Sequence, residues 1–294
     1  AGTTPANILT VNALSGLSFN NFTLVSGTFV PNGMIHVVSG TWSQTGGAFN
    51  STSTAQISIG GNFSQTGGSF LTVSTFVFNG GVQTVSISSS SRFGHLVSSV
   101  STSLTAASDI AITSLTISRG NYTHGSYRTK LGGALAVQGG TFDRANGIWE
   151  FSGTSSQTVP SNSDWGTVAV SNQAGMVFSG NSTVVNLSIE ALGVFVGQNQ
   201  QTTVTGNWSS SGTYSNAVST VIFSGGNAQS LWTVPGSTFN HVTVNKSASA
   251  TLQLLSNMQM AGDLVVSGAN FNLGQSTLTI SGSIIDGAGN LLAG

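Results

Sequence analysis

A ten-residue segment near the N-terminal end of the chain is repeated a short distance further on. Residues 40–49 read GTWSQTGGAF and residues 61–70 read GNFSQTGGSF, so most positions are identical or similar. A period of ~21 residues is typical of one coil of a solenoid, in which each coil stacks on its neighbours. The short repeat therefore predicts a stack of coils.

A longer repeat contains the short one. Three segments share an aromatic residue, a small polar residue, a glycine, a short gap and then glutamine, and they are Phe78–Val85, Phe151–Val159 and Phe223–Leu231. Each is followed by a second aromatic residue and a short alternating stretch, as in Phe239–Val244. The copies begin near positions 76, 149 and 221, which gives a long period of ~72 residues.

The local pattern predicts an all-β chain. Short runs such as Leu278–Ser281 alternate apolar and polar residues, and glycine or asparagine follows every few residues. We therefore predict a β-solenoid, similar to a parallel β-helix, with coils of ~21 residues inside repeats of ~72 residues. The alternative is a row of tandem β-sandwich units, because residues 99–140 keep the short period poorly.

Three regions follow from this pattern. Residues 1–39 are expected to hold an N-terminal strand and the first coils, residues 40–285 the repeats, and residues 286–294 a C-terminal tail. The chain contains no run of 18 apolar residues, so no transmembrane helix is expected.

The composition excludes several classes of function. Only 4% of the 294 residues are charged, the formal net charge is −1, and there is no cysteine. A chain this neutral has no basic surface for nucleic acid, and without cysteine it has no disulfide, thiolate nucleophile or cysteine-bound metal. Because 38% of the residues are hydrophobic and the mean hydropathy is +0.21, disorder is not expected either.

We expect no enzyme activity, no cofactor and no metal site. Asp143 and Glu150 are the closest acidic pair, yet an extended chain would place them on opposite faces and about 23 Å apart. The four histidines show no spacing typical of metal ligands, and His95 and His241 share one repeat position. The expected catalytic, cofactor-binding and metal-binding sets are therefore empty.

Two kinds of segment are candidates for contacts between subunits. One is a basic and aromatic cluster, for which the alternative is an ordinary solvated loop; its residues are Arg119, Tyr122, Tyr127, Arg128 and Lys130. The other is a pair of terminal strands that could add to the sheet of a neighbouring copy, and its residues are Ile8, Leu9, Val11, Leu278 and Ile280.

Eight asparagines lie in the Asn-x-Ser/Thr sequence that is the acceptor for N-glycosylation. They are Asn21, Asn50, Asn62, Asn121, Asn181, Asn186, Asn207 and Asn245. A chain this rich in asparagine, serine and threonine contains about this many by chance. N-glycosylation is therefore an open expectation at these positions.

The last repeat shows a resemblance most clearly. Phe223 to Gln229, then Phe239–Val244, then Ala261–Val266 resemble the repeats of large secreted proteins of bacterial and archaeal cell surfaces, rich in Gly, Ser, Thr and Asn. The resemblance covers about residues 40–285. It implies a β-rich, surface-exposed protein of the adhesive or assembly-forming type, and it implies no specific activity.

These observations lead to one expected function and one alternative. We expect a structural subunit, secreted after removal of a signal peptide, that assembles with copies of itself into an extracellular filament, sheath or surface layer, since a neutral surface removes repulsion between copies. The alternative is a cell-surface adhesin or carbohydrate-binding solenoid, in which exposed tryptophan and tyrosine rings bind surface glycans.

Overall fold

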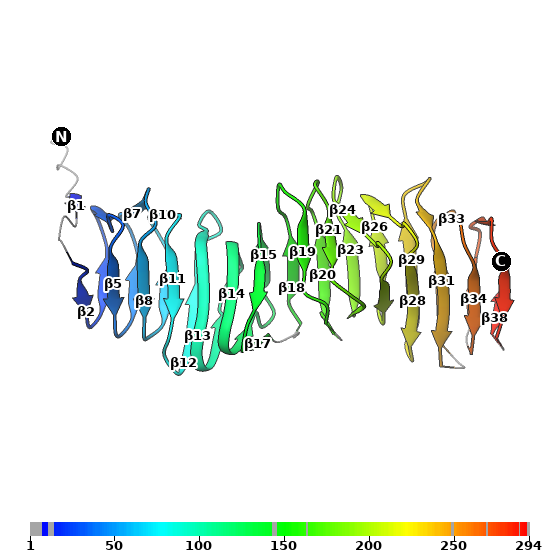
Figure 1. The fold of residues 1–294 in the computed structure, drawn as a ribbon, viewed down its shortest axis with the longest axis horizontal. Helices are drawn as coiled ribbons and strands as arrows, with labels where there is room; N and C mark the ends of the chain where they lie inside the picture. The colour runs from blue at the N-terminus through cyan, green and yellow to red at the C-terminus, as the bar shows by residue number, and fades with distance from the viewer. Residues whose placement is uncertain are drawn as a thin grey trace. The chain divides into compact units, whose positions relative to one another are not determined.

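The computed structural model describes residues 8–10, 15–142, 146–162, 164–247, 250–268, 270–287 and 289–292, which form 38 β-strands and no helix (Figure 1). Strands of successive coils pair in parallel, as Val168 does with Leu187 and Trp208 does with Leu231. A β-sandwich consists of antiparallel sheets, so the sandwich alternative is wrong. The solenoid prediction is confirmed, with about 13 coils spaced about 20 residues apart.

The chain divides into two compact units, residues 1–147 and residues 148–294. In the first unit each coil contributes to three walls, and the first wall contains β1 (Ile8–Thr10), β4 (Thr28–Val30), β7 (Ala48–Ser51) and β10 (Ser69–Thr72). The second wall begins with β2 (Ser18–Phe19), β5 (Ile35–Val38), β8 (Gln56–Ile59) and β11 (Thr75–Phe78). The third wall begins with β3 (Phe22–Leu24), β6 (Trp42–Gln44), β9 (Phe63–Gln65) and β12 (Val82–Ser86).

The later coils of the first unit are less segmented. Two long strands, β13 (Phe93–Ala106) and β14 (Ile110–Thr123), each continue along both the second and the third wall. Three short strands then pair with β14, namely β15 (Arg128–Leu131), β16 (Leu135–Val137) and β17 (Thr141–Phe142). β13 passes through its corner within residues 99–119, which contain neither Gly nor Asn, whereas β14 has Gly120 and Asn121 at its corner. The short repeat is therefore hard to recognise in this part of the sequence.

The second unit also has three walls, named here walls I, II and III. Wall I contains β18 (Ile148–Phe151), β20 (Thr167–Val170), β23 (Asn186–Ile189), β26 (Trp208–Ser210), β29 (Gln229–Thr233), β32 (Thr251–Leu254), β35 (Asn270–Asn272) and β38 (Asn290–Leu292). Wall II contains β19 (Gln157–Val159), β21 (Met176–Phe178), β24 (Val194–Val196), β27 (Thr213–Ser215), β30 (Thr238–Phe239), β33 (Met258–Met260) and β36 (Leu278–Ile280). Wall III contains β22 (Ser182–Val184), β25 (Gln201–Val204), β28 (Thr220–Gly225), β31 (His241–Lys246), β34 (Leu264–Ser267) and β37 (Ile284–Asp286).

Alternate side chains of each strand point into the coil and form the core. In the first unit aromatic rings stack from coil to coil, with ring centroids 4.1 Å apart for Phe22 and Trp42 and 5.6 Å apart for Trp42 and Phe63. In the second unit Phe195 and Tyr214 stack at 5.8 Å. Because these rings repeat at the spacing of the strands, each coil buries its apolar face only when a neighbouring coil covers it.

The short repeat corresponds to one coil, and its Gly-Gly pair forms a stacked corner. Gly47 and Gly68 both have positive φ angles, 63° and 72°. A Cβ atom on Gly68 would lie 2.2 Å from the carbonyl oxygen of Gly47 in the preceding coil. The corner therefore requires glycine both for its backbone conformation and for the close approach of the coils.

One period of the long repeat spans three complete coils and then two more walls of the next coil. Within the second unit, Phe151 ends β18 on wall I, whereas Phe223 of the next copy lies in β28 on wall III. The shared motif therefore occupies the corner from wall I to wall II in one copy and the corner from wall III to wall I in the next. Because the long period is not a whole number of coils, the motif moves around the solenoid.

Candidate functional site

The glutamine shared by the long repeats is a buried brace between coils. Gln83 is buried, and its Oε1 accepts a hydrogen bond of 2.7 Å from the backbone N–H of Gly80. Its Nε2 donates to the carbonyl oxygens of Ile59 and Gly61 in the preceding coil. In the next copy Gln157, also buried, accepts from the backbone N–H of Gly153 at 2.9 Å. The repeated Gln is therefore a structural residue that satisfies buried backbone groups at a corner.

The third copy of this brace includes a buried lysine. Gln229 donates to the carbonyl oxygens of Val204 at 3.0 Å and Gly206 at 2.6 Å. Its Oε1 accepts a hydrogen bond of 2.5 Å from Nζ of Lys246, which is 4% exposed. Loss of hydration on burial lowers the pKa of Lys246. The sequence does not reveal this pair, because its two residues belong to different strands, β29 and β31.

Five of the eight asparagines in the predicted glycosylation sequences precede or begin a strand, whereas Asn50, Asn121 and Asn245 lie within β7, β14 and β31. Oδ1 of Asn62 accepts a hydrogen bond of 2.8 Å from the backbone N–H of Thr84 in the next coil, and Asn207 accepts one of 2.9 Å from Ser230. In all eight sequences the Asn and the Ser/Thr are exposed or half-buried, whereas the residue between them is buried. The alternation of outward and inward side chains along a strand thus explains this sequence pattern without any glycan. N-glycosylation stays a prediction.

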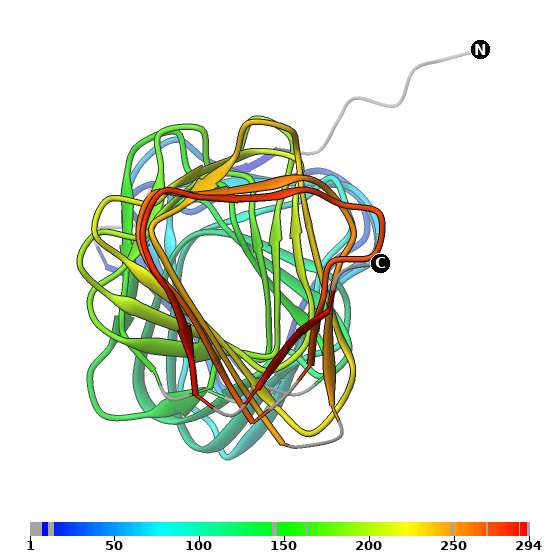
Figure 2. The same cartoon turned by 90° about the vertical axis from the view of Figure 1, so that its right-hand side faces the viewer.

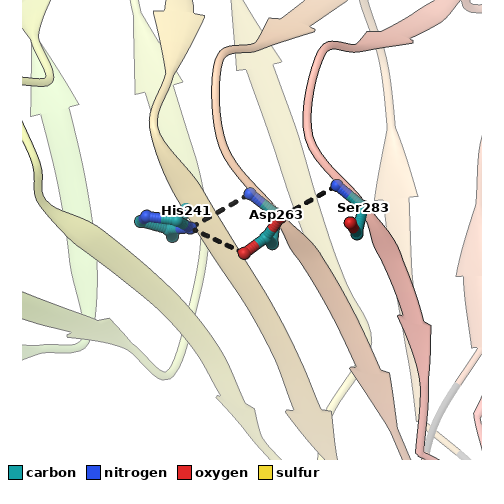
Figure 3. A network of polar contacts seen from close by, with 3 residues as sticks. All are labelled: His241, Asp263 and Ser283. Carbon is teal, nitrogen blue, oxygen red and sulfur yellow. Dashed lines mark hydrogen bonds and ion pairs between the residues drawn. The ribbon is translucent and has the colours of Figure 1, made fainter.

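Figure 3 shows the same type of corner with different residues at the start of wall III. Nδ1 of His241 accepts a hydrogen bond of 3.0 Å from the backbone N–H of Asp263, and Oδ1 of Asp263 accepts one of 2.8 Å from the backbone N–H of Ser283. The imidazole also lies 3.7 Å from the Asp263 carboxylate, with both side chains partly exposed. These three residues link three successive coils, which is a structural role.

The basic and aromatic cluster is divided between two strands. Arg119 and Tyr122 belong to β14, whereas Arg128 and Lys130 belong to β15. Tyr122 is fully buried and its hydroxyl is 2.9 Å from Oγ1 of Thr129, so its ring is in the core and cannot contact another subunit. Arg119 and Lys130 are exposed and Arg128 is half-buried.

The remaining aromatic residue of this cluster lies beside a shallow hollow. Tyr127 is exposed and, together with Ile87 and Asp109, lines a surface hollow of about 300 Å³. The backbone N–H of Arg128 donates to Oδ1 of Asp109 at 2.9 Å, so the carboxylate orders the turn. The exposed part of the predicted contact is therefore Arg119, Tyr127 and Lys130.

The C-terminal strand candidates lie on the last coil that the structure describes, and the edge of this coil that faces away from the preceding coil is here called the open edge. Within the part of the chain that the structure describes, β36, β37 and β38 pair only with β33, β34 and β35 of the preceding coil. Leu278 and Ile280 are half-buried, whereas Met258 and Met260, their register partners, are fully buried. Figure 2 views this red coil from its open side.

The N-terminal candidates are described only in part. Ile8 and Leu9 form β1 and pair in register with Thr28 and Phe29, but their side chains, like the whole of Val11, lie outside the described residues. The strand predicted at this end is therefore present as backbone.

Neither catalysis nor metal binding is indicated by the acidic groups. Asp143 lies outside the described residues, and Glu150 is buried and accepts a hydrogen bond of 2.7 Å from Oγ of Ser171. Where side chains are described, no three His, Cys, Asp or Glu residues gather as metal ligands would. No helix that could cross a membrane occurs in the described ranges either.

Most of the aromatic residues that could form sugar platforms are in the core. Trp165 and Trp208 occupy repeat positions where other copies have phenylalanine, which predicts that both are core residues. Both are buried, as is Trp149, so this prediction is confirmed. Trp232 is 36% exposed on wall I and lies between Phe223 and Phe239, the two aromatic positions of the third repeat. The described residues therefore provide no row of exposed rings for a carbohydrate.

The buried tyrosines predict a loss of stability at alkaline pH. Burial raises the pKa of Tyr122 and of Tyr214 to about 12, against 10.0 in an unfolded chain. The folded protein therefore holds these protons more tightly, and the stabilisation present below pH 10 is lost as the pH rises towards 12. Lys246 has the opposite effect. Because its pKa is lowered in the folded protein, its contribution to the free energy of unfolding increases as the pH rises through that lowered value.

We expect urea unfolding midpoints to fall between pH 10 and pH 12, and to fall less steeply in Tyr122→Phe and Tyr214→Phe. Each variant also loses a hydroxyl hydrogen bond, which costs about 1 kcal/mol at neutral pH. The comparison is therefore made on the pH slope of each protein. If the urea midpoint fell with pH as steeply in both variants as in the unmodified protein, unfolding would not release protons from these hydroxyls in this pH range.

No protein-family model matches this chain, and no curated protein or solved structure matches it. The function must therefore be inferred from the coils, their corners and their exposed surfaces.

Proposed function

We propose that this protein is a structural subunit of an extracellular assembly, in which copies join by adding coil to coil at the open edge of β36, β37 and β38. The supporting observation is the exposure of core positions on that coil. Ile284 is 56% exposed although its register partner Leu264 is fully buried, and Leu291 is 40% exposed although Phe271 is fully buried. These positions become core when another coil covers them.

The chain itself indicates what can cover this edge. Within each unit the edge of an internal coil is covered by another coil, through parallel strand pairs and stacked inward side chains. A second copy offers the same geometry at β1, β2 and β3, whose strands pair only with β4, β5 and β6 among the described residues. Such a head-to-tail contact propagates into a filament.

The composition favours the same role outside the cell. A formal net charge of −1 and 4% charged residues leave little repulsion between copies and little that responds to salt or pH. The fold is compatible with a filament, a sheath or a surface layer. An adhesin that uses aromatic platforms is less favoured, since Trp149, Trp165, Trp208 and Tyr122 are buried.

A double substitution at the open edge tests this proposal. We expect Ile284→Lys with Leu291→Lys to raise the concentration required for assembly at least tenfold, because the two charges would be buried at the joint. Val82→Lys with Val218→Lys is the matched control, since these valines are 69% and 63% exposed and lie away from the edge. The measurement is sedimentation velocity with electron microscopy on purified protein.

Two results would contradict the proposal in different ways. If the unmodified protein stays monomeric at high concentration, it is not a self-assembling subunit. If the edge variant assembles as readily as the control, copies join at another surface.

A further inference from the structure

Wall III carries an unbroken outward-facing column of β-branched residues. The register places one such residue on each of six successive strands: Thr183, Thr203, Ile222, Thr243, Val265 and Ile285. All six are half-buried or exposed, whereas their strand neighbours Val221, Val242 and Leu264 are in the core. Figure 1 shows β28, β31 and β34 of this wall side by side.

The surroundings of this column are polar and nearly uncharged. A second outward column contains Ser224, Asn245 and Ser267, in register on β28, β31 and β34. Among the side chains that the structure describes on and beside this wall, the partly exposed ionisable groups are His241 and Asp263, which lie 3.7 Å apart. Two such walls therefore carry few charged groups that could repel each other.

The geometry of the column determines which kind of surface can pack against it. β-Branched side chains have few rotamers, so they lose little entropy when they are covered. Their spacing is that of neighbouring strands, about 4.8 Å. A surface that fits between every pair of rungs must have the same spacing, as another sheet does in face-to-face packing.

We propose that wall III is a lateral self-association surface, on which the column of one copy packs face to face against the same column of a second copy. The two walls would interlock through the methyl groups of the Thr, Val and Ile residues, with the Ser and Asn column at the rim. The contact is side by side and thus distinct from the joint at β36, β37 and β38.

The size of the wall sets the strength of this contact. Six strands and about four residues along each give roughly 400 Å² per copy, about 800 Å² for the pair, which is below the roughly 1,200–2,000 Å² of a stable interface. A single pair of walls is therefore weak, and many pairs along two filaments act together. The inference therefore rests on the proposed filament, because only the many lateral contacts along two filaments would together be strong enough to form a bundle.

The proposal also has a consequence for one predicted glycosylation site. Asn245 is exposed on β31 beside the column. A glycan there would prevent the two walls from approaching. Laterally packed material must therefore carry an unmodified Asn245, whatever the state of the other sequences.

The first test separates the lateral contact from the end contact. In Ile222→Lys with Val265→Lys we expect filaments of normal length that have lost at least nine-tenths of the side-by-side association seen in the unmodified protein by electron microscopy and low-speed pelleting. Ser209→Lys with Gln253→Lys is the matched control, with the same added charge on β26 and β32 of wall I. Equal bundling in both variants would overturn the proposal.

A second test does not require filaments. The chain has no cysteine, so Thr243→Cys places a single thiol at the centre of the column, and Ser209→Cys places one on wall I. Under mild oxidation at high protein concentration, Thr243→Cys should give at least tenfold more disulfide dimer than Ser209→Cys. Equal yields would overturn the lateral contact, and absence of filaments together with a high yield from Thr243→Cys would overturn only the proposed end joint.

Discussion

Trp208→Ala is expected to lower the free energy of unfolding of the second unit by about 3–5 kcal/mol, the range for truncation of a large core aromatic residue. Trp208 is 1% exposed, and its ring centroid lies 5.1 Å from that of Tyr214 and 5.2 Å from that of Phe239. Those rings belong to its own and the next coil. On the other side, the ring centroid of Trp208 lies 6.2 Å from that of Phe195 in the preceding coil, so the cavity would weaken contacts on both sides.

Urea unfolding followed by circular dichroism measures this loss, and hydrogen exchange locates it. Protection should fall most in β23, β26 and β29, because a solenoid transmits a defect mainly to neighbouring coils. Trp208→Phe is the control, since Phe63 occupies the equivalent position in the first unit, and it should cost less than half as much. A loss below about 1 kcal/mol in Trp208→Ala would show that the coils close around the cavity.

Gly68→Ala is expected to destabilise the first unit by about 3 kcal/mol or more, from a left-handed backbone conformation and an overpacked corner together. The φ angle of Gly68 is 72°, and an added Cβ would lie 2.2 and 2.5 Å from the carbonyl oxygens of Gly47 and Gly46. Those atoms are backbone of the preceding coil. The corner can therefore accept a methyl group only if the two coils separate.

Gly236→Ala is a matched control for the backbone conformation alone. Its φ angle is 87°, and nothing lies within 4 Å of the added Cβ. We expect a cost of about 1 kcal/mol, which represents the left-handed conformation without a clash. If the urea midpoints of the two variants fell by equal amounts, the close stacking of the Gly-Gly corners would not contribute to stability.

The sequence predicts the coil well because each coil repeats its own chemistry. Alternation of polar and apolar residues, aromatic residues at a fixed place and glycine at the corners all depend on neighbours along the chain. Comparison of repeats places Trp165 and Trp208 in the core, as the structure confirms. The solenoid follows because so short a repeat needs another coil to cover its apolar face.

The misplaced residue and the missed residue have different causes. Tyr122 is between Asn121 and Thr123 on a strand, so alternation alone would turn it inward, but its basic neighbours favoured a surface contact. Lys246 follows the inward Val242 and Val244, yet a lysine is buried only where a partner exists, and its partner Gln229 is on another strand. The contact between Lys246 and Gln229 cannot be identified without the register between coils.

The outward column of wall III could not be predicted for the same reason. Successive coils differ in length, since Ala169 pairs with Ser188 whereas Ser209 pairs with the more distant Trp232. A fixed repeat length applied to the sequence would therefore assign the wrong residues to the column after a few coils. Only the observed strand register shows that Thr203 and Thr243 face the same solvent as Ile222.

The position of the long repeat has a consequence for how such a chain can grow. From Phe151 to Phe223 the motif advances by three coils and two further walls. A gene duplication of that block would lengthen the solenoid and preserve its core and corners, but it would move each outer side chain to a different wall. A uniform column along one wall cannot be copied in this way. Duplication of the block would therefore reproduce the interior, but it would not by itself extend the outer column of wall III.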